Sequence, residues 1–208
     1  MKAFIYIGGA IHPDTITAHP AGDDLVIAAD SGYENAIALG EKPSILVGDL
    51  DSLKMDVPDG VELVRLKPEK DVTDTQAAAH IAIEEGATAI TFIGGLSGRL
   101  DHTMSNLSLL EELSAQNIYA IIDDGANRVR FIRNSSALIG RSHYKYLSVL
   151  AADDKVKGVD IDGCKYNLKN AVITRRDQYG VSNEITGNCA LIAVKKGGVY
   201  IVESRDAK

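Results

Sequence analysis

A change of pattern near residue 125 divides this chain of 208 residues into two parts with different fold classes. Before that point, short apolar runs alternate with segments whose apolar residues recur at helical spacing. The expected strands are 3–7, 25–29, 45–47, 61–66, 88–93 and 118–122, and the expected helices are 33–39, 75–85 and 102–116. Alternating strands and helices predict an α/β fold, with a Rossmann-like parallel sheet and crossover helices.

After residue 125, short β-rich runs follow one another and are separated by turn clusters, without a long helical pattern. The expected strands are 128–132, 146–151, 171–174, 190–194 and 199–203. Regularly spaced strands and turns predict an all-β sandwich. We therefore expect an α/β domain over residues 1–125 and a β-sandwich domain over residues 126–208.

Charge and composition limit the partners of this chain. Its formal net charge of -7 argues against binding to nucleic acid, which requires clustered Lys and Arg. No apolar run approaches the roughly 20 residues of a membrane span, and the N-terminal segment does not resemble a secretory signal. We expect a cytoplasmic protein that binds neither nucleic acid nor membrane, and we expect a metal to mediate any phosphate binding. The cysteines, Cys164 and Cys189, are expected to be buried thiols.

The segments that follow the expected strands are rich in glycine and aspartate. In open α/β sheets, ligands bind at the carboxyl ends of the strands, so these segments are the candidate site. They are Gly8-Gly9, Asp30-Ser31-Gly32, Gly48-Asp49-Leu50-Asp51-Ser52, Lys70-Asp71-Val72-Thr73-Asp74, and Gly94-Gly95-Leu96-Ser97-Gly98-Arg99-Leu100-Asp101-His102.

Asp49 and Asp51 lie on the same side of an extended segment, because side chains alternate with a period of two. Two such carboxylates repel each other unless a cation or an unequally shared proton relieves the repulsion. Carboxylate oxygens suit Mg²⁺, which substrate phosphates commonly help to coordinate. A solvated turn is the alternative, since Asp and Ser are frequent turn residues.

Thr73 and Gln76 fit a capping box, and Asp74 in the first helical turn would favour the helix dipole. A carboxylate in that position could also reach a metal, so the structural and the ligand-binding interpretations are compatible.

The glycine-rich segment from Gly94 to Gly98 could present backbone N–H groups to an anion, with Arg99 adding a forked positive charge. Asp101 fits the N-cap of the following helix. His102, taken alone, is more often a hydrogen-bonded structural histidine than a catalytic one.

Taken in series, four of these motifs resemble the thiamine pyrophosphokinase family. They begin at Asp30, Gly48, Lys70 and Gly94 and are followed by a β-rich tail that contains Tyr179-Gly180-Val181-Ser182-Asn183-Glu184. The resemblance covers about residues 29–203. Members of that family transfer the terminal diphosphate of ATP to the hydroxyethyl group of thiamine and release AMP, usually with Mg²⁺.

The resemblance implies a catalytic domain that binds nucleotide and metal over residues 1–125 and a thiamine-binding sandwich over residues 126–208. It also implies a homodimer whose active sites lie between subunits. The implied catalytic residues are Asp49, Asp51, Asp74, Lys70 and Asp71. The implied Mg²⁺ ligands are Asp49, Asp51 and Asp74. The implied nucleotide-binding residues are Asp30, Thr73, Ser97, Arg99, Asp101 and His102. The implied thiamine-binding residues are Ser182 and Asn183.

The chain departs from the family pattern at Cys164 and at Gln178-Tyr179, and it contains no tryptophan, so any stacking on a substrate ring would use Tyr or Phe. Three alternatives to the thiamine reaction follow from the residues. The first is the same transfer to another alcohol, such as a pterin. The second is a regulator that binds nucleotide or thiamine without turnover. The third is a structural module whose aspartates are caps and turns.

Overall fold

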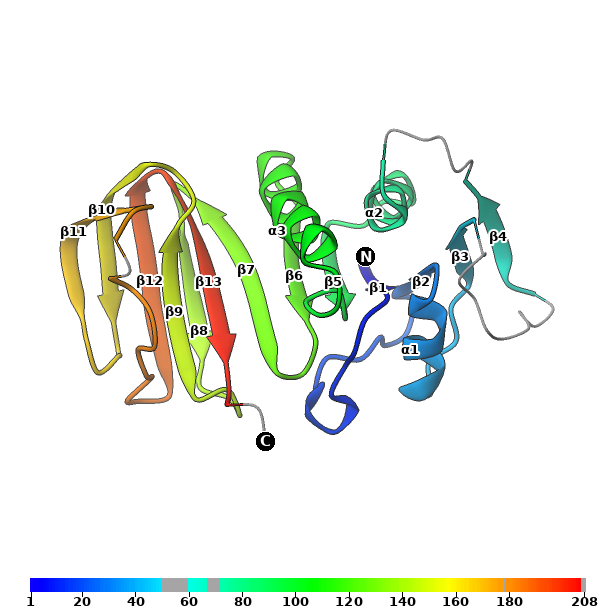
Figure 1. The fold of residues 1–208 in the computed structure, drawn as a ribbon, viewed down its shortest axis with the longest axis horizontal. Helices are drawn as coiled ribbons and strands as arrows, with labels where there is room; N and C mark the ends of the chain where they lie inside the picture. The colour runs from blue at the N-terminus through cyan, green and yellow to red at the C-terminus, as the bar shows by residue number, and fades with distance from the viewer. Residues whose placement is uncertain (50–59, 67–71, 178, 207–208) are drawn as a thin grey trace. The chain divides into compact units, whose positions relative to one another are not determined.

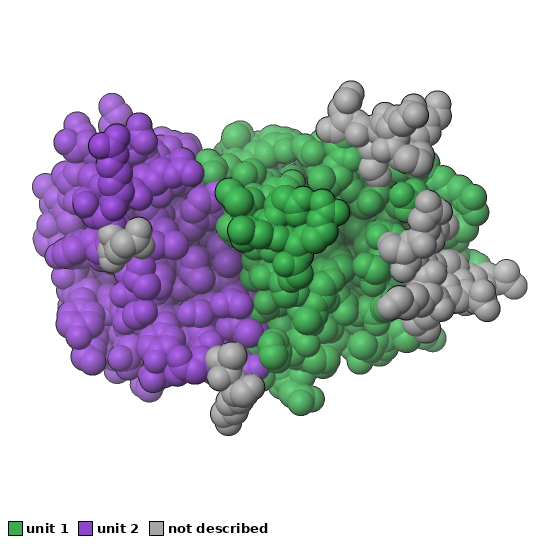
Figure 2. All heavy atoms as spheres, in the orientation of Figure 1, with its two compact units in different colours: residues 1–125 green, residues 126–208 purple. Residues whose placement is uncertain are grey.

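The computed structural model describes residues 1–49, 60–66, 72–177 and 179–206. The chain forms two compact units, Met1–Gly125 (unit 1) and Ala126–Lys208 (unit 2), which Figure 2 shows in different colours. Among the described residues, none of the helices has the length and apolar character needed to cross a membrane.

Unit 1 is built on a parallel sheet. Its strands are β1 (Lys2–Tyr6), β2 (Leu25–Ala29), β3 (Ile45–Gly48), β4 (Glu62–Arg65), β5 (Ala89–Ile93) and β6 (Tyr119–Asp123). Its helices are the 3-10 helix η1 (Pro13–Thr15) and the α-helices α1 (Gly32–Ala38), α2 (Asp74–Glu84) and α3 (Leu100–Ala115). The strands pair in parallel in the order β4-β3-β2-β1-β5-β6, with α1 on one face and α2 and α3 on the other (Figure 1). The predicted α/β fold is confirmed.

Helix α2 begins at Asp74 because Thr73 caps it: the Gln76 N–H donates to Thr73 Oγ1 at 3.1 Å. The reciprocal bond of the predicted capping box is not formed among the described contacts. Gln76 Nε2 instead donates to Glu112 Oε2 on α3 at 2.8 Å. The start of α2 is therefore joined to α3 by a side-chain hydrogen bond.

The strand order of unit 1 changes direction at β1, which pairs with β2 on one side and with β5 on the other. At such a point, the loops after the two strands diverge and leave a crevice at their carboxyl ends. A ligand site is expected there on topology alone.

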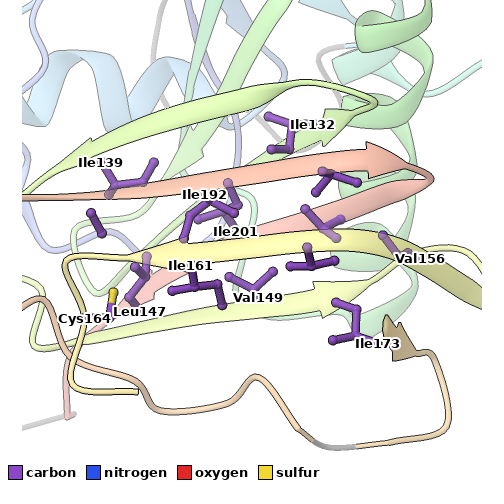
Figure 3. Close-up of a cluster of buried hydrophobic side chains, with 14 residues drawn as sticks. Ile132, Ile139, Leu147, Val149, Val156, Ile161, Cys164, Ile173, Ile192 and Ile201 are labelled. Atoms are coloured by element: carbon purple, nitrogen blue, oxygen red, sulfur yellow. The ribbon is translucent and has the colours of Figure 1, made fainter. Parts of the chain in front are cut away.

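Unit 2 contains only strands in its described residues. They are β7 (Asn127–Arg133), β8 (Ser136–Gly140), β9 (Tyr146–Ala151), β10 (Lys155–Asp162), β11 (Leu168–Thr174), β12 (Cys189–Lys196) and β13 (Gly198–Ser204). They pair antiparallel in the orders β7-β13-β9 and β11-β10-β12-β8. Both sheets contribute to one apolar cluster, which includes Val149, Ile161, Ile192 and Ile201 (Figure 3). The predicted sandwich is confirmed.

Two strands of unit 2, β8 and β10, have no counterpart in the sequence prediction. In β10 the register with β11 shifts between Lys157 and Val159, around Gly158, whose φ is 66°. This bulge buries both Val156 and Val159, which are three residues apart, and so breaks the period of two by which strands are recognised. Strand β8 lies at the edge of its sheet and is mostly exposed.

The two cysteines differ in burial. Cys164 is buried, as expected, but Cys189 is exposed, so the expectation of a buried thiol is wrong there. Cys189 precedes the buried Ala190 in β12, and alternate residues of a strand point to opposite faces.

Candidate active site

A pocket of about 390 Å³ lies at the carboxyl ends of the strands of unit 1. The segments after β1, β2 and β5 line it, together with the first turns of α2 and α3. It therefore occupies the crevice that the strand order predicts. Of the predicted nucleotide- and metal-binding residues, the pocket brings together Asp30, Thr73, Asp74, Ser97, Arg99 and His102.

Asp30 is the first residue after β2, and its backbone is left-handed, with φ of 49°. Its N–H donates to Val47 O on β3 at 2.8 Å. A Cβ built on Gly48 would lie 3.4 Å from Asp30 Cα, so the ends of β2 and β3 are in close contact. Asp49 is exposed and follows Gly48 directly. Asp30 and Asp49 therefore come after the ends of neighbouring strands.

The predicted Mg²⁺ ligands are only partly described. Asp51 lies outside the described residues, and so do the predicted catalytic residues Lys70 and Asp71. Within the ranges that the structure describes, no three His, Cys, Asp or Glu side chains gather as metal ligands do. Asp30 and Asp74 nevertheless line the same pocket, and carboxylate oxygens are the ligands that Mg²⁺ prefers, so the residues present fit such an ion.

Two N–H groups of the glycine turn after β5 form hydrogen bonds within unit 1. The Gly94 N–H donates to Asp123 O at 2.9 Å and the Gly95 N–H to Gly8 O at 3.0 Å. Both of these donors therefore have partners within unit 1, so an anion would have to bind to the other N–H groups of the segment from Gly94 to Gly98, which stays a prediction. Ser97 also holds the turn in place, since its Oγ accepts a hydrogen bond from the Ala10 N–H at 2.7 Å.

Arg99 and Asp101 form an exposed ion pair at the rim of the pocket. Arg99 Nε donates to Asp101 Oδ1 at 3.1 Å, and Nη2 donates to Oδ2 at 2.5 Å. These hydrogen bonds hold the pKa of the Asp101 carboxyl below its ordinary value. Helix α3 begins at Leu100 with Arg99 at the N-cap, so the prediction that Asp101 is the N-cap is wrong. Asp101 instead lies in the first turn, where its Oδ1 accepts from the His102 N–H at 3.0 Å.

Two asparagines that were not predicted from the sequence, Asn35 and Asn106, bind the backbone of the pocket. Asn35 Nδ2, on α1, donates to Ile7 O at 2.8 Å and to Gly9 O at 3.0 Å. Asn106 Nδ2, on α3, donates to Gly95 O at 2.9 Å, and Asn106 lines the pocket. The sequence does carry one indication of Asn106: it lies one helical turn after His102, and therefore on the same face of a helix that starts at the site.

In unit 2, Asn183 is used to hold the fold. Its side chain is 7% exposed, and Oδ1 accepts from the N–H groups of Tyr166 and Glu184, each at 3.0 Å. Its Nδ2 donates to Tyr166 O at 2.7 Å. The neighbouring Ser182 is exposed and left-handed, with φ of 61°, and its N–H donates to Ser148 Oγ at 3.0 Å. Asn183 thus ties two loops together, while the hydroxyl of Ser182 stays at the surface.

A second pocket, of about 520 Å³, lies beside Asn183 in unit 2. Tyr166 and Tyr179 line it and are 62% and 66% exposed. Both tyrosines therefore offer ring area to a planar ligand.

Comparison with known families accounts for both units. The family model "Thiamin pyrophosphokinase, catalytic domain" matches residues 20–122, and "Thiamin pyrophosphokinase, vitamin B1 binding domain" matches residues 136–199. The chain belongs to the thiamine pyrophosphokinase family. The catalytic-domain match of this family spans the pocket residues from Asp30 to Asn106, and the vitamin B1 binding match spans the pocket of unit 2.

Individual relatives extend over the whole chain. A thiamine pyrophosphokinase from Bacillus subtilis is 27% identical, over 99% of this chain and 100% of the relative. A crystal structure of thiamine pyrophosphokinase from Bacillus subtilis shares the fold with a TM-score of 0.89, at 24% identity and full coverage of both chains. A thiamin pyrophosphokinase structure from Geobacillus thermodenitrificans gives a TM-score of 0.86 at 25% identity, over 100% of this chain and 99% of the other.

Proposed function

We propose that this chain is a thiamine diphosphokinase that transfers diphosphate from ATP to thiamine and releases AMP. Unit 1 is the catalytic domain, which binds nucleotide and metal, and unit 2 binds thiamine. The observation that carries the proposal is the pocket of unit 1, where motifs far apart in the sequence meet at the switch point of a thiamine pyrophosphokinase fold.

Transfer of this kind requires positioning and charge neutralisation more than covalent chemistry. The N-termini of α2 and α3 both lie at the pocket, so their helix dipoles favour phosphate there. The fork of Arg99 provides two donors for phosphate oxygens once it exchanges Asp101 for the nucleotide. Lys70, Asp71, Ser97 and His102 complete the proposed nucleotide side of the site.

The proposed metal is Mg²⁺, held by Asp49, Asp51 and Asp74 with Asp30 nearby. When bound, such an ion neutralises charge on the phosphate oxygens. These residues would hold the ion near the ends of β2 and β3, which the close approach of Gly48 and Asp30 brings together.

Thiamine would bind at the loops of unit 2 that carry Ser182, Tyr166 and Tyr179, with Asn183 holding these loops in place. The tyrosine rings suit a cationic thiazolium and a flat aminopyrimidine, and Ser182 can hydrogen-bond to the substrate. In the reaction, the thiamine oxygen bonds to the β-phosphorus while the bond from that phosphorus to the oxygen retained by AMP breaks. The hydroxyl proton passes to a carboxylate of the site.

The homodimer with active sites between subunits and the cytoplasmic location stay predictions. Light scattering tests whether the protein is a dimer, because a dimer has twice the 22.2 kDa of the chain.

The test of function is AMP release from ATP in Mg²⁺ buffer, with and without thiamine, with the thiamine diphosphate measured by chromatography. We expect both products to rise together and EDTA to stop both. Asp49→Asn should lower the rate by about 10²–10³-fold, as removal of a group that stabilises transition-state charge does. Asp23→Asn, the same change at an exposed aspartate outside the pocket, should not.

Each alternative predicts a different result from this assay or from a measurement of ATP binding, and the structural module predicts no Mg²⁺-dependent binding of ATP. AMP release with a pterin alcohol, but not with thiamine, would show that the acceptor is a pterin alcohol and not thiamine. ATP binding without AMP release under any acceptor would indicate a regulator. Tyr179→Ala should raise KM for thiamine and leave KM for ATP unchanged, and an unchanged KM for thiamine would contradict the acceptor site in unit 2.

A further inference from the structure

Two glycine turns touch at the switch point of unit 1, Gly8-Gly9 after β1 and Gly94-Gly95 after β5. The Gly95 N–H donates to Gly8 O at 3.0 Å. A Cβ built on Gly94 would lie 2.5 Å from Ile7 O, a distance that no side chain tolerates. The two backbones are therefore in direct contact, and Gly8, Gly9 and Gly95 of these turns line the pocket.

Asn35 and Asn106 bind these turns from opposite faces of the sheet, since α1 lies on one face and α3 on the other (Figure 1). Asn35 Nδ2 donates to Ile7 O at 2.8 Å and to Gly9 O at 3.0 Å. Asn106 Nδ2 donates to Gly95 O at 2.9 Å. Each turn is thus held by an amide donor that comes from a different helix.

The contact of Asn106 is buried, because its side chain is only 7% exposed. A Cβ built on Gly95 would lie 2.7 Å from Asn106 Nδ2, so the amide rests directly on the turn. Removal of a donor from a buried carbonyl costs more than the net value of the bond, because the acceptor loses water as well. Gly95, Ser97 and Gly98 all line the pocket, so a displaced turn would change the surface that the nucleotide meets.

We infer that Asn35 and Asn106, here named the asparagine clamp, are positioning residues that fix the two glycine turns for nucleotide binding. The inference rests on the proposed function for the identity of the ligand, ATP. The clamp acts through the backbone of the turns, and neither asparagine is assigned a contact with the reacting atoms.

The chemistry of the clamp requires a donor at Asn106. An ionised aspartate has acceptors only, so Asn106→Asp would set a carboxylate against Gly95 O. Burial and the nearby carbonyl raise the pKa of the introduced carboxyl above the ordinary value of about 3.9. Once protonated, the carboxyl donates an O–H and restores the bond. The defect of this variant should therefore lessen as the pH falls, whereas Asn106→Leu has no donor at any pH.

The experiment measures ATP affinity by titration calorimetry, without thiamine, from pH 5.5 to pH 8.5. At the upper pH we expect Asn106→Asp and Asn106→Leu to weaken ATP binding by about 10-fold relative to wild type. Towards the lower pH, the ATP affinity of Asn106→Asp should approach that of wild type, whereas the affinity of Asn106→Leu should not. Ser108→Asp adds the same charge at an exposed position of α3 and should follow wild type throughout. Asn35→Asp, at a less buried position, is measured in parallel and should show the same trend.

If the ratio of the ATP dissociation constants of Asn106→Asp and wild type stays constant across the pH range, the inference is overturned. So would variants that melt at lower temperature but bind ATP as wild type does overturn it, because that result indicates a purely structural role. A wild-type protein that binds ATP but makes no thiamine diphosphate would overturn the proposed function and leave the clamp standing. If wild type binds no ATP, amide hydrogen exchange of residues 94–98 decides: it should be faster in Asn106→Leu, and unchanged exchange would overturn the clamp.

Discussion

At the scale of single residues, Cys164 and Cys189 show how burial determines the reactivity of a thiol. Cys164 is packed in the sandwich core with Val149 and Ile161 (Figure 3), whereas Cys189 is exposed at the start of β12. Burial, with a smaller contribution from Asp162, raises the pKa of the Cys164 thiol above its ordinary value. Since the thiolate is the reactive form, Cys164 is protected in two ways: reagents cannot reach the buried sulfur, and the raised pKa keeps the thiol protonated.

We predict that native protein at pH 8 reacts rapidly with a thiol reagent such as 5,5'-dithiobis(2-nitrobenzoate) at Cys189 only. Cys189→Ser should abolish the fast phase, and Cys164→Ser should leave it unchanged. In denaturant both thiols should react. Two fast phases in the native protein would show that the core around Cys164 opens more readily than its burial indicates.

Site residues that follow a strand end were predictable from the sequence. Residues whose role depends on tertiary contacts were less so. The sequence placed Asp30, Asp74 and Ser97 at the site because such ends meet at one edge of a parallel sheet. The roles of Asn106 and Asn183 in holding backbone were not predictable, because their acceptors, Gly95 and Tyr166, are contacts that only the folded chain brings together.

At the scale of elements, the turn between β9 and β10 is fixed by a two-bond ion pair. Arg133 at the end of β7 donates from Nη1 and Nη2 to the two carboxylate oxygens of Asp153, both at 2.8 Å. The Gly198 N–H also donates to Asp153, at 3.0 Å. These contacts, Arg133 foremost, hold the pKa of the Asp153 carboxyl below its ordinary value.

Because the pKa of Asp153 is lower in the folded than in the unfolded protein, its stabilising effect is present above about pH 4 and is lost as the pH falls through the folded value. Both side chains are partly exposed, so solvent screening limits the effect to about 1 kcal/mol. We predict that Asp153→Asn lowers the free energy of unfolding at pH 7 by up to this amount and that the difference from wild type shrinks near pH 3. Urea unfolding at both pH values measures it.

Asp154→Asn is the matched control for Asp153→Asn, because Asp154 is exposed and adjacent. It should change stability by less than Asp153→Asn at pH 7. If Asp153→Asn lowers the free energy of unfolding by the same amount at both pH values, the electrostatic explanation is contradicted.

Elements with regular periodicity were predictable from sequence, whereas the bulged strand was not. The predicted strands 25–29 and 146–151 are observed with these bounds as β2 and β9. The predicted helix 102–116 begins earlier, at Leu100, because Arg99 and not Asp101 takes the capping position. In β10, the bulge at Gly158 hides a strand whose buried residues no longer alternate.

At the scale of the whole molecule, the fold class followed from local texture, since helical periodicity stops where the sandwich begins. The net charge of -7 is a second whole-molecule property with a functional consequence. A negative protein repels ATP at long range, and salt screens that repulsion, with a Debye length that falls from about 30 Å at 0.01 M to about 8 Å at 0.15 M.

We predict that, in EDTA, the association rate of ATP rises when KCl is increased from about 0.01 M to about 0.15 M, because screening reduces the repulsion between like charges. Stopped-flow measurement checks this, with uncharged adenosine as the control, whose rate should not change. A rate for ATP that falls with salt would show that positive groups of the pocket, such as Arg99, outweigh the net charge.

The central place of β1 in the parallel sheet has a consequence for synthesis of the chain. One edge of β1 pairs with β2, but the other pairs with β5, which begins only at Ala89. At ribosomal rates of about 5–20 residues per second, several seconds separate the two strands, and for that time the backbone N–H and C=O groups of one edge of β1 have no strand partner. Unpaired strand edges invite intermolecular pairing. The nascent chain is therefore most in need of a chaperone in the interval before β5 emerges from the ribosome.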